Sequence, residues 1–179
     1  MEMTSILNAA ALIPRFDENG KPYTIVVKNN HTEKVHLKAP VILDKQLHQI
    51  GSSLKGAKEA AKAMLGTTSM HPVITQARPI PNIWFPSEST RNDTCMYFAL
   101  HQIVKMEPYL IDNTIVYLAG KYAVTVPVPR SKFVLRYNQA LIYFAMTFLK
   151  QLLDAPYCSL KEAREILRCA ELNEAYITQ

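Results

Sequence analysis

The sequence predicts an α+β protein: antiparallel strands, a short basic helix in the middle of the chain, and one long apolar helix plus a short helix at the C-terminus. Three features support this prediction. The first fifty residues hold β-branched and apolar segments separated by turn clusters. A period of three to four residues begins after Ser52, and a longer stretch of the same period begins at Arg130. We expect one domain over residues 1–179, strand-rich over 1–50, with a core over 51–130 and a helical part over 130–179.

Composition limits the kind of protein that this sequence can encode. Its 179 residues are 49% hydrophobic and 20% charged, as in an ordinary soluble globular protein with a sizeable core. Lys and Arg number 20 against 15 for Asp and Glu, so the net charge is +5, which favours a polyanionic partner without requiring one. The sequence shows neither a cleavable leader nor a run of about 18 apolar residues. We therefore expect neither secretion nor membrane insertion.

Cysteine and histidine spacing argues against a disulfide framework, a metal site and an enzyme. The three cysteines include no Cys-x-x-Cys pair, and the five histidines are scattered. Cys95 has no designated base nearby in the sequence, and no nucleophile motif or phosphate loop occurs. His101 is expected to be a satisfied histidine of the core or of an interface, on an apolar strand. We expect a cytoplasmic, non-enzymatic protein that needs no cofactor.

The first fifty residues carry strand signals. Apolar or β-branched segments at 5–13, 23–27 and 33–37 are separated by turn clusters at 17–20 and 29–30. Pro40 closes this part and leads into another apolar segment, 41–43. We predict a meander or hairpin stack of strands over this whole region.

An amphipathic helix is predicted after Ser52. Apolar residues recur at steps of three and four, at Leu54, Ala57, Ala61 and Met64 or Leu65. Ser52 and Ser53 are candidate N-caps, and Gly66 stands where a C-terminal cap belongs. Lysines at i, i+3 and i+7 form one cationic stripe beside the apolar face: Lys55, Lys58 and Lys62.

Residues 66–92 are rich in Pro, Ser and Thr and hold no sustained period, so we expect an ordered loop region with short strands at 73–75 and 83–85. A loop of this length inside a compact domain is usually functional or mobile. Further along the chain, three segments are β-like, and residues 119–121 form a hairpin turn between the last two of them. These segments are 95–106, 114–118 and 122–126.

The longest helix is predicted to begin at Arg130. One face carries Val134, Tyr137, Leu141, Ala145, Phe148 and Leu152, and Phe133, Ala140 and Phe144 widen it until few polar positions remain. Such a helix is expected to pack inside the protein or across a two-fold interface. Pro156 breaks it, and a capping box at Ser159 starts a last amphipathic helix through Leu160, Ala163, Leu167 and Ala170.

Three groups of residues suit phosphate binding. The lysine stripe projects from a helix whose unpaired N–H groups near Ser52 and Ser53 favour an anion, although a solvated face partly compensated by Glu59 is the alternative. Residues 87–92 combine hydroxyls, an amide and Arg91, which can clamp phosphate or enter a narrow minor groove. The alternative is a polar surface turn anchored by Trp84 and Phe85. The last group, Arg130, Lys132 and Arg136, binds phosphate or lies along the apolar helix.

Several motifs in order resemble the ComK family, the competence transcription factors of Gram-positive bacteria. They are Gly-Ser-Ser-x-x-Gly-x-Lys from Gly51 to Lys58, Ser69-x-x-Pro72-x-Ile74, Phe85-Pro86-Ser87-x-Ser89-Thr90-Arg91, and Val126-Pro127-Val128 followed by Phe133. The resemblance implies an activator that binds A/T-rich promoter sites in double-stranded DNA, largely from the minor groove, as a homodimer or a pair of dimers. The DNA-binding residues that we predict are Ser52, Ser53, Lys55, Lys58, Lys62, His71, Arg78, Ser87, Ser89, Thr90, Arg91 and Asn92.

The chain also departs from the family pattern. Tyr97 stands where the family tends to have tryptophan, and Arg136 and Gln139 occupy places where a Gln and then an Arg are more usual. The aromatic C-terminal segment by which some relatives are recruited to an adaptor and protease is not evident after Pro156, which leaves control by proteolysis open. A competing hypothesis is a regulatory module that binds no DNA and dimerises through the apolar helix over residues 130–153.

Overall fold

The computed structural model describes residues 6, 8–77 and 79–154. Its strands and helices are β1 (Ala9–Phe16), β2 (Pro22–Lys28), β3 (Thr32–Val35), α1 (Ala39–His48), α2 (Leu54–Leu65), β4 (Val73–Gln76), β5 (Asn82–Pro86), β6 (Tyr97–Ala99), the 3-10 turn η1 (Leu100–Gln102), β7 (Ile103–Tyr109), β8 (Asn113–Leu118), β9 (Ala123–Val126) and α3 (Arg130–Asp154). The expected α+β class is thereby confirmed. Arg78 and the helix predicted to begin at Ser159 lie outside the described residues.

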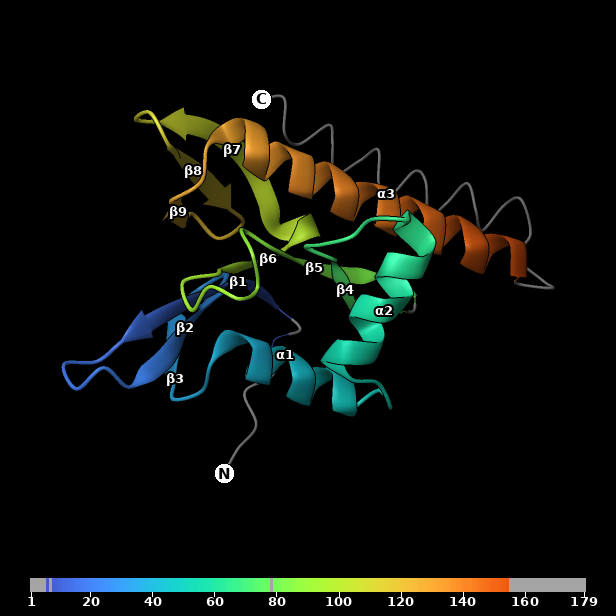
Figure 1. The fold of residues 1–179 in the computed structure, drawn as a ribbon, viewed down its shortest axis with the longest axis horizontal. Helices are drawn as coiled ribbons and strands as arrows, with labels where there is room; N and C mark the ends of the chain where they lie inside the picture. Colours follow the sequence, from blue (N-terminus) through green and yellow to red (C-terminus); the bar gives the residue numbers. More distant parts are fainter. Residues whose placement is uncertain (1–5, 7, 78, 155–179) are drawn as a thin grey trace.

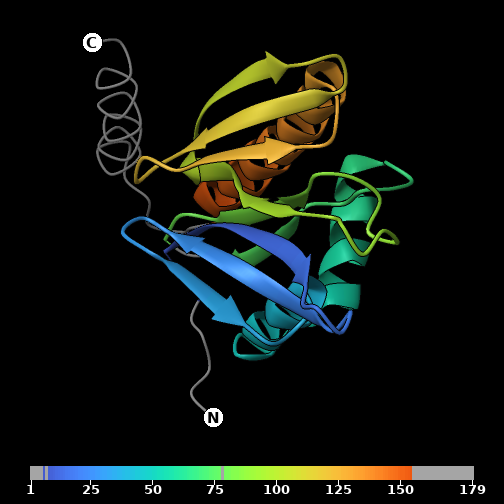
Figure 2. The ribbon, with the colours of Figure 1, turned by 90° about the vertical axis from the view of Figure 1, so that its left-hand side faces the viewer.

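The strands form two antiparallel sheets, and the buried side chains form two hydrophobic cores. The larger sheet has the order β3-β2-β1-β6-β5-β4, and the smaller has the order β7-β8-β9. Helix α1 lies against one face of the larger sheet, and α3 and the smaller sheet lie over its other face (Figures 1 and 2). Helix α2 stands beside the β4 edge and contributes to the cores on both faces. The large sheet is therefore the middle layer of the molecule.

Strands β5 and β6 are buried on both faces because successive side chains of a strand point to opposite sides. Trp84 and Tyr97 belong to the core beneath α1 and α2. Phe85 and Phe98 belong to the opposite core, where Phe133 of α3 packs against both rings at centroid distances of 5.6 and 5.3 Å. This aromatic cluster joins α3 to the centre of the sheet.

Helix α2 is the element that the sequence predicted best. The Ser53 hydroxyl accepts a hydrogen bond from the Gly56 amide at 3.1 Å, so Ser53 is the N-cap. Gly66 ends the helix with a φ of 65°, the left-handed conformation that glycine adopts without strain. The predicted helix and its C-terminal cap are confirmed.

The prediction of strands throughout the first fifty residues is wrong, because Ala39–His48 is the helix α1. Pro40 lies in the first helical turn, where its missing N–H is not needed. Ile42, Leu43 and Leu47 are buried on one side of this helix, and we interpreted the β-branched residues among them as a continuation of the strands. The strands β1, β2 and β3 themselves were expected.

Two further predictions need correction. Residues 95–106 are not one β-like segment, because η1 separates β6 from β7, and His101 lies exposed in that turn rather than on a strand. The inward face of α3 is formed by Phe133, Ala140 and Tyr143, whereas Leu141, which we placed on the packed face, is 45% exposed. The helix is therefore packed inside along one side only.

The two sheets touch at their turns. The β8–β9 turn contains Gly120, whose φ is 86°, and a Cβ atom built at Gly120 would lie 2.1 Å from the backbone oxygen of Asn29. Asn29 lies in the β2–β3 connection of the larger sheet. Only glycine permits this close approach.

Among the described residues, no helix is long and apolar enough to cross a bilayer.

The role of the aromatic cluster leads to a stability prediction. Phe133→Ala should lower the free energy of unfolding by about 3–5 kcal/mol, because it removes a fully buried ring between Phe85 and Phe98. Leu141→Ala is the matched control on the same helix, since Leu141 is 45% exposed and should change stability by less than about 1 kcal/mol. Urea unfolding of both variants measures the difference, and equal losses would contradict the packing described.

Candidate nucleic-acid interface

The predicted phosphate-binding elements lie on one side of the molecule. Helix α2 and the connection between β5 and β6 both face the viewer in Figure 1 and both lie on the right-hand side in Figure 2. Lys58 of α2 interacts electrostatically with Cys95 at the end of this connection. The Cys95 thiol in turn donates to the carbonyl of Glu88 at 3.4 Å. Lys58 thus lies on the same side of the molecule as this connection and within electrostatic range of its Cys95 end.

Two half-buried cations, Lys58 and Arg136, each lie within electrostatic range of Cys95. Burial lowers the pKa of Lys58, and it also lowers the pKa of Arg136 on α3, where the Glu88 carboxylate partly opposes the shift. Arg136 donates through Nε to the sulfur of Met70 at 3.1 Å, but its buried Nη1 has no hydrogen-bond partner among the described residues. Neither cation forms a salt bridge with another described residue. An anion bound here would compensate for the lost hydration.

The N-terminus of α2 is less available to an anion than the sequence suggested. The amide of Leu54 donates to the Asp44 carboxylate at 2.7 Å, and the amide of Gly56 donates to Ser53. Both groups that we expected to be unpaired are therefore satisfied inside the protein. Lys55 and Lys62 remain exposed on α2, and Ser52 is half-buried.

The connection between β5 and β6 holds its shape through its own side chains. Ser87 is 1% exposed, and its hydroxyl accepts the Met96 amide at 3.0 Å. The Glu88 carboxylate accepts hydrogen bonds from the Asn92 amide group and from the Thr94 hydroxyl. We call these Glu88 contacts the Glu88 clasp. They leave Arg91 exposed at the turn.

The polar side chains of this connection thus divide into two kinds. The Ser87 hydroxyl and the Asn92 amide are engaged inside the protein, and Ser89 accepts the amide of Arg91 at 3.4 Å. Arg91 and the half-buried Thr90 have no such side-chain bond to another described residue. Ser87 therefore positions the connection, and its hydroxyl is too buried to touch a phosphate.

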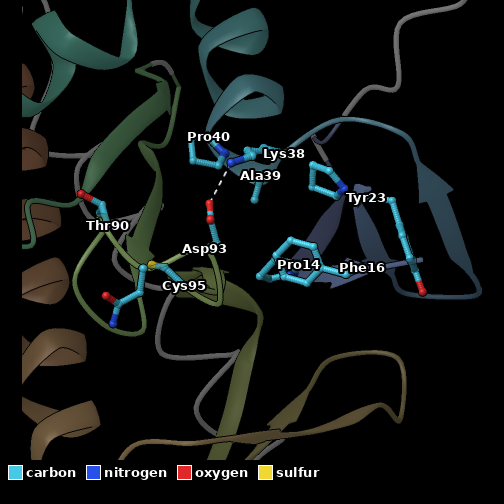
Figure 3. Close-up of a pocket in the computed structure, with 11 residues that line it drawn as sticks. Pro14, Phe16, Tyr23, Lys38, Ala39, Pro40, Thr90, Asp93 and Cys95 are labelled. Carbon is cyan, nitrogen blue, oxygen red and sulfur yellow. Dashed lines mark hydrogen bonds and ion pairs between the residues drawn. The ribbon is translucent and has the colours of Figure 1, made fainter. Parts of the chain in front are cut away.

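A salt bridge ties the connection to the first part of the chain. Lys38, the residue before α1, donates to Asp93 at 2.8 Å across a small pocket (Figure 3). Figure 3 shows Thr90 and Cys95 on one side of this pocket and Phe16 and Tyr23 on the other. The pocket holds about 40 Å³, room for a water molecule but not for a nucleotide base.

The remaining candidate residues are spread around this region. The half-buried His71 places Nε2 2.9 Å from the Thr67 carbonyl. Arg78 lies outside the described residues. Of the third basic group, Arg130 donates to the Met106 carbonyl at 3.1 Å and Lys132 is exposed at the start of α3. Of this group, Arg136 alone is half-buried and within electrostatic range of Cys95.

A model of a known protein family matches this chain. The family is described as ComK protein, and the match covers residues 7–151. The chain belongs to the ComK family. The resemblance of the motifs is thus confirmed, and it places the chain in a family of competence transcription factors rather than of enzymes. Comparison with curated proteins and with solved structures gave no match.

This ComK family member contains functional candidates that sequence reasoning did not select. Arg136 was noticed as a basic residue but was not assigned to the site, and Glu88 and Lys38 were not considered. Arg136 could have been recognised in the sequence because it lies on an otherwise apolar helix. A cation that faces inward on such a helix needs a polar or anionic partner. Among residues 6, 8–77 and 79–154, no three His, Cys, Asp or Glu side chains come together as a metal site.

The Glu88 clasp leads to a prediction about the order of the connection. Glu88→Ala should speed amide exchange at Asn92 and Cys95 by roughly 5- to 30-fold, because two side-chain hydrogen bonds that hold the turn are lost. Hydrogen–deuterium exchange with site resolution measures this change. Glu59→Ala, which removes an exposed acid from α2, is the control and should leave both amides unchanged. Equal exchange in both variants would show that the clasp does not order the turn.

Proposed function

We propose that this protein is a cytoplasmic transcriptional activator of competence genes whose single ComK-like domain binds A/T-rich sites in double-stranded DNA. Membership of the ComK family supports the general role. The binding mode rests on two half-buried cations, Lys58 and Arg136, which form no salt bridge with another described residue. Both lie near Cys95, at the end of the connection that exposes Arg91. A phosphate is the anion that best satisfies two cations in an open surface position.

Each element has a distinct part in the proposed contact. Lys58 and Arg136 each neutralise backbone phosphate, and the exposed Lys55 and Lys62 extend the contact along the backbone. Arg91 enters the minor groove, where A/T-rich sequence narrows the groove and concentrates negative potential. This division of labour fits recognition through groove width, because short hydroxyls and cations carry no major-groove base code.

A second copy of the chain is proposed to cover the outer face of α3. Large apolar residues are exposed there at helical spacing: Leu135, Ile142, Met146, Leu149 and Leu153. The stripe extends over 18 residue steps, about 27 Å of helix. Pairing of two such faces would give the homodimer, or a pair of dimers, that A/T-rich repeated sites require.

The same face supports a second candidate function. If the protein acts only by pairing with a relative, the α3 stripe is the working surface and the cations are incidental. This regulatory module would associate normally and bind no DNA. Measuring DNA binding and self-association on the same samples distinguishes the two candidates.

DNA binding should depend differently on Arg91 and Lys58. Arg91→Ala is expected to weaken binding to phased A/T tracts by about tenfold more than binding to scrambled duplexes of equal composition, because Arg91 reads groove shape. Lys58→Ala should weaken both about equally and make the log–log salt slope shallower by about 0.9, the value for one phosphate contact. Fluorescence anisotropy over a salt series measures both quantities.

The control for this series is Lys21→Ala, which removes an exposed cation from the β1–β2 turn. It changes the net charge by the same amount and should leave the A/T preference intact. Unchanged binding in both Arg91→Ala and Lys58→Ala would reject the site, and no binding by the unmodified chain would favour the regulatory module.

Self-association should depend on the α3 stripe. Ile142→Glu is expected to shift the protein to monomer, because a carboxylate in the centre of an apolar helix pair loses its hydration. Sedimentation velocity measures the mass. Ile50→Glu is the matched control, since Ile50 is 50% exposed beyond the end of α1 and should not alter the mass. An Ile142→Glu variant that stays associated would place the contact elsewhere.

A further inference from the structure

The turn between β7 and β8 exposes two large aliphatic side chains. Leu110 is 74% exposed and Ile111 is 93% exposed, and both lie between Tyr109 and Asn113, the last paired residues of the hairpin. Leu110 has a φ of 54°, a left-handed conformation that glycine, asparagine or aspartate adopts more readily. Neither solubility nor turn geometry therefore accounts for these residues, and such strain is typical of functional turns.

The turn is rigidly supported. Strands β7 and β8 pair along the whole hairpin, and β8 pairs with β9 on its other side. Thr114, next to the turn, is fully buried and donates to the Val128 carbonyl at 2.7 Å. Val116 and Leu118 fix β8 in the core. Leu110 and Ile111 thus form an apolar projection at the tip of a supported hairpin.

The projection lies on the side of the molecule proposed to bind DNA. In Figure 2 the β7–β8 turn, the connection between β5 and β6, and α2 are all on the right-hand side, and in Figure 1 the turn is at the upper left, beyond the connection. Arg130 is fixed to β7 through its bond to the Met106 carbonyl. A duplex that contacts α2 and Arg91 can therefore extend to this turn.

We propose that Leu110 and Ile111 form a wedge that enters the minor groove and partly unstacks one base step of the bound site. Proteins that bind the minor groove insert Leu or Ile in this way and kink the duplex by roughly 20–90°. A/T-rich sites contain TA steps, which unstack easily. The inference rests on the proposed function, because it needs a duplex held by Lys58, Arg136 and Arg91.

The carboxylate of Asp112 beside the turn provides a second test of the proposal. Asp112 is exposed next to Ile111, and a carboxylate close to phosphates is repelled. If DNA occupies this position, Asp112→Asn should raise affinity by about two- to tenfold at low salt, and the gain should shrink as salt rises. A protein partner seated on the apolar tip would not produce this salt-dependent gain on DNA.

The experiment uses the full chain and a duplex with phased A/T tracts. End-to-end energy transfer reports bending, and 2-aminopurine placed at the TA steps reports unstacking. The double variant Leu110→Gly with Ile111→Ser removes the wedge, and glycine suits the left-handed position, so the hairpin should fold as before. Val104→Ser is the control, because Val104 is 51% exposed on β7 of the same hairpin.

The unmodified chain and Val104→Ser should bend the duplex and raise the 2-aminopurine signal. The double variant should bind with an unchanged salt slope, lose most of the bend and the signal, and lose about tenfold in preference for A/T tracts. Bending and unstacking equal to those of the unmodified chain would overturn the wedge. Loss of self-association without loss of bending per bound protein would also overturn it, in favour of a protein contact. No DNA binding by the unmodified chain would instead refute the proposed function.

Discussion

The structure depends on the pairing of β5 with β6, two adjacent strands that are buried on both faces. Their aromatic side chains supply the centre of each core: Trp84 and Tyr97 toward α1 and α2, Phe85 and Phe98 toward α3. Trp84 Nε1 and the Tyr97 hydroxyl are buried without a hydrogen-bond partner among the described residues, and burial raises the pKa of Tyr97. Because the same two strands carry the ends of the Arg91 connection, the packing of the cores also fixes where that connection begins and ends.

Acidic side chains hold the connection between β5 and β6 and its surroundings in place. Acidic groups occupy positional roles: Glu88 closes the turn, Asp93 binds Lys38, and Asp44 caps α2. Lys58 and Arg136 have no such carboxylate within salt-bridge distance among the described residues. Preorganised geometry around unneutralised cations lowers the ordering cost of binding an anion. The acidic side chains therefore hold the backbone of the connection in place, and the described residues supply no carboxylate to neutralise Lys58 or Arg136.

Local patterns predicted the elements whose signals are local. The Ser53 cap, the Gly66 terminus and the hairpin of β8 with β9 follow from residues close in sequence. Helix α1 was missed because its β-branched residues are equally suited to a strand, and only tertiary contacts decide between the two. The outward face of α3 was misassigned because apolar residues surround the helix, so periodicity alone does not distinguish Phe133 from Leu135. The environment of Arg136 depends on Met70 and Cys95, distant in sequence, and no local pattern encodes it.

The close contact of Gly120 with Asn29 couples the β8–β9 turn to the larger sheet. The two sheets carry different parts of the surface, and their separation at this point is set by a residue that has no side chain. A methyl group at position 120 would push the β8–β9 turn away from the larger sheet and tilt the smaller sheet together with its turns. The angle between the two sheets therefore depends on the absence of a side chain at position 120.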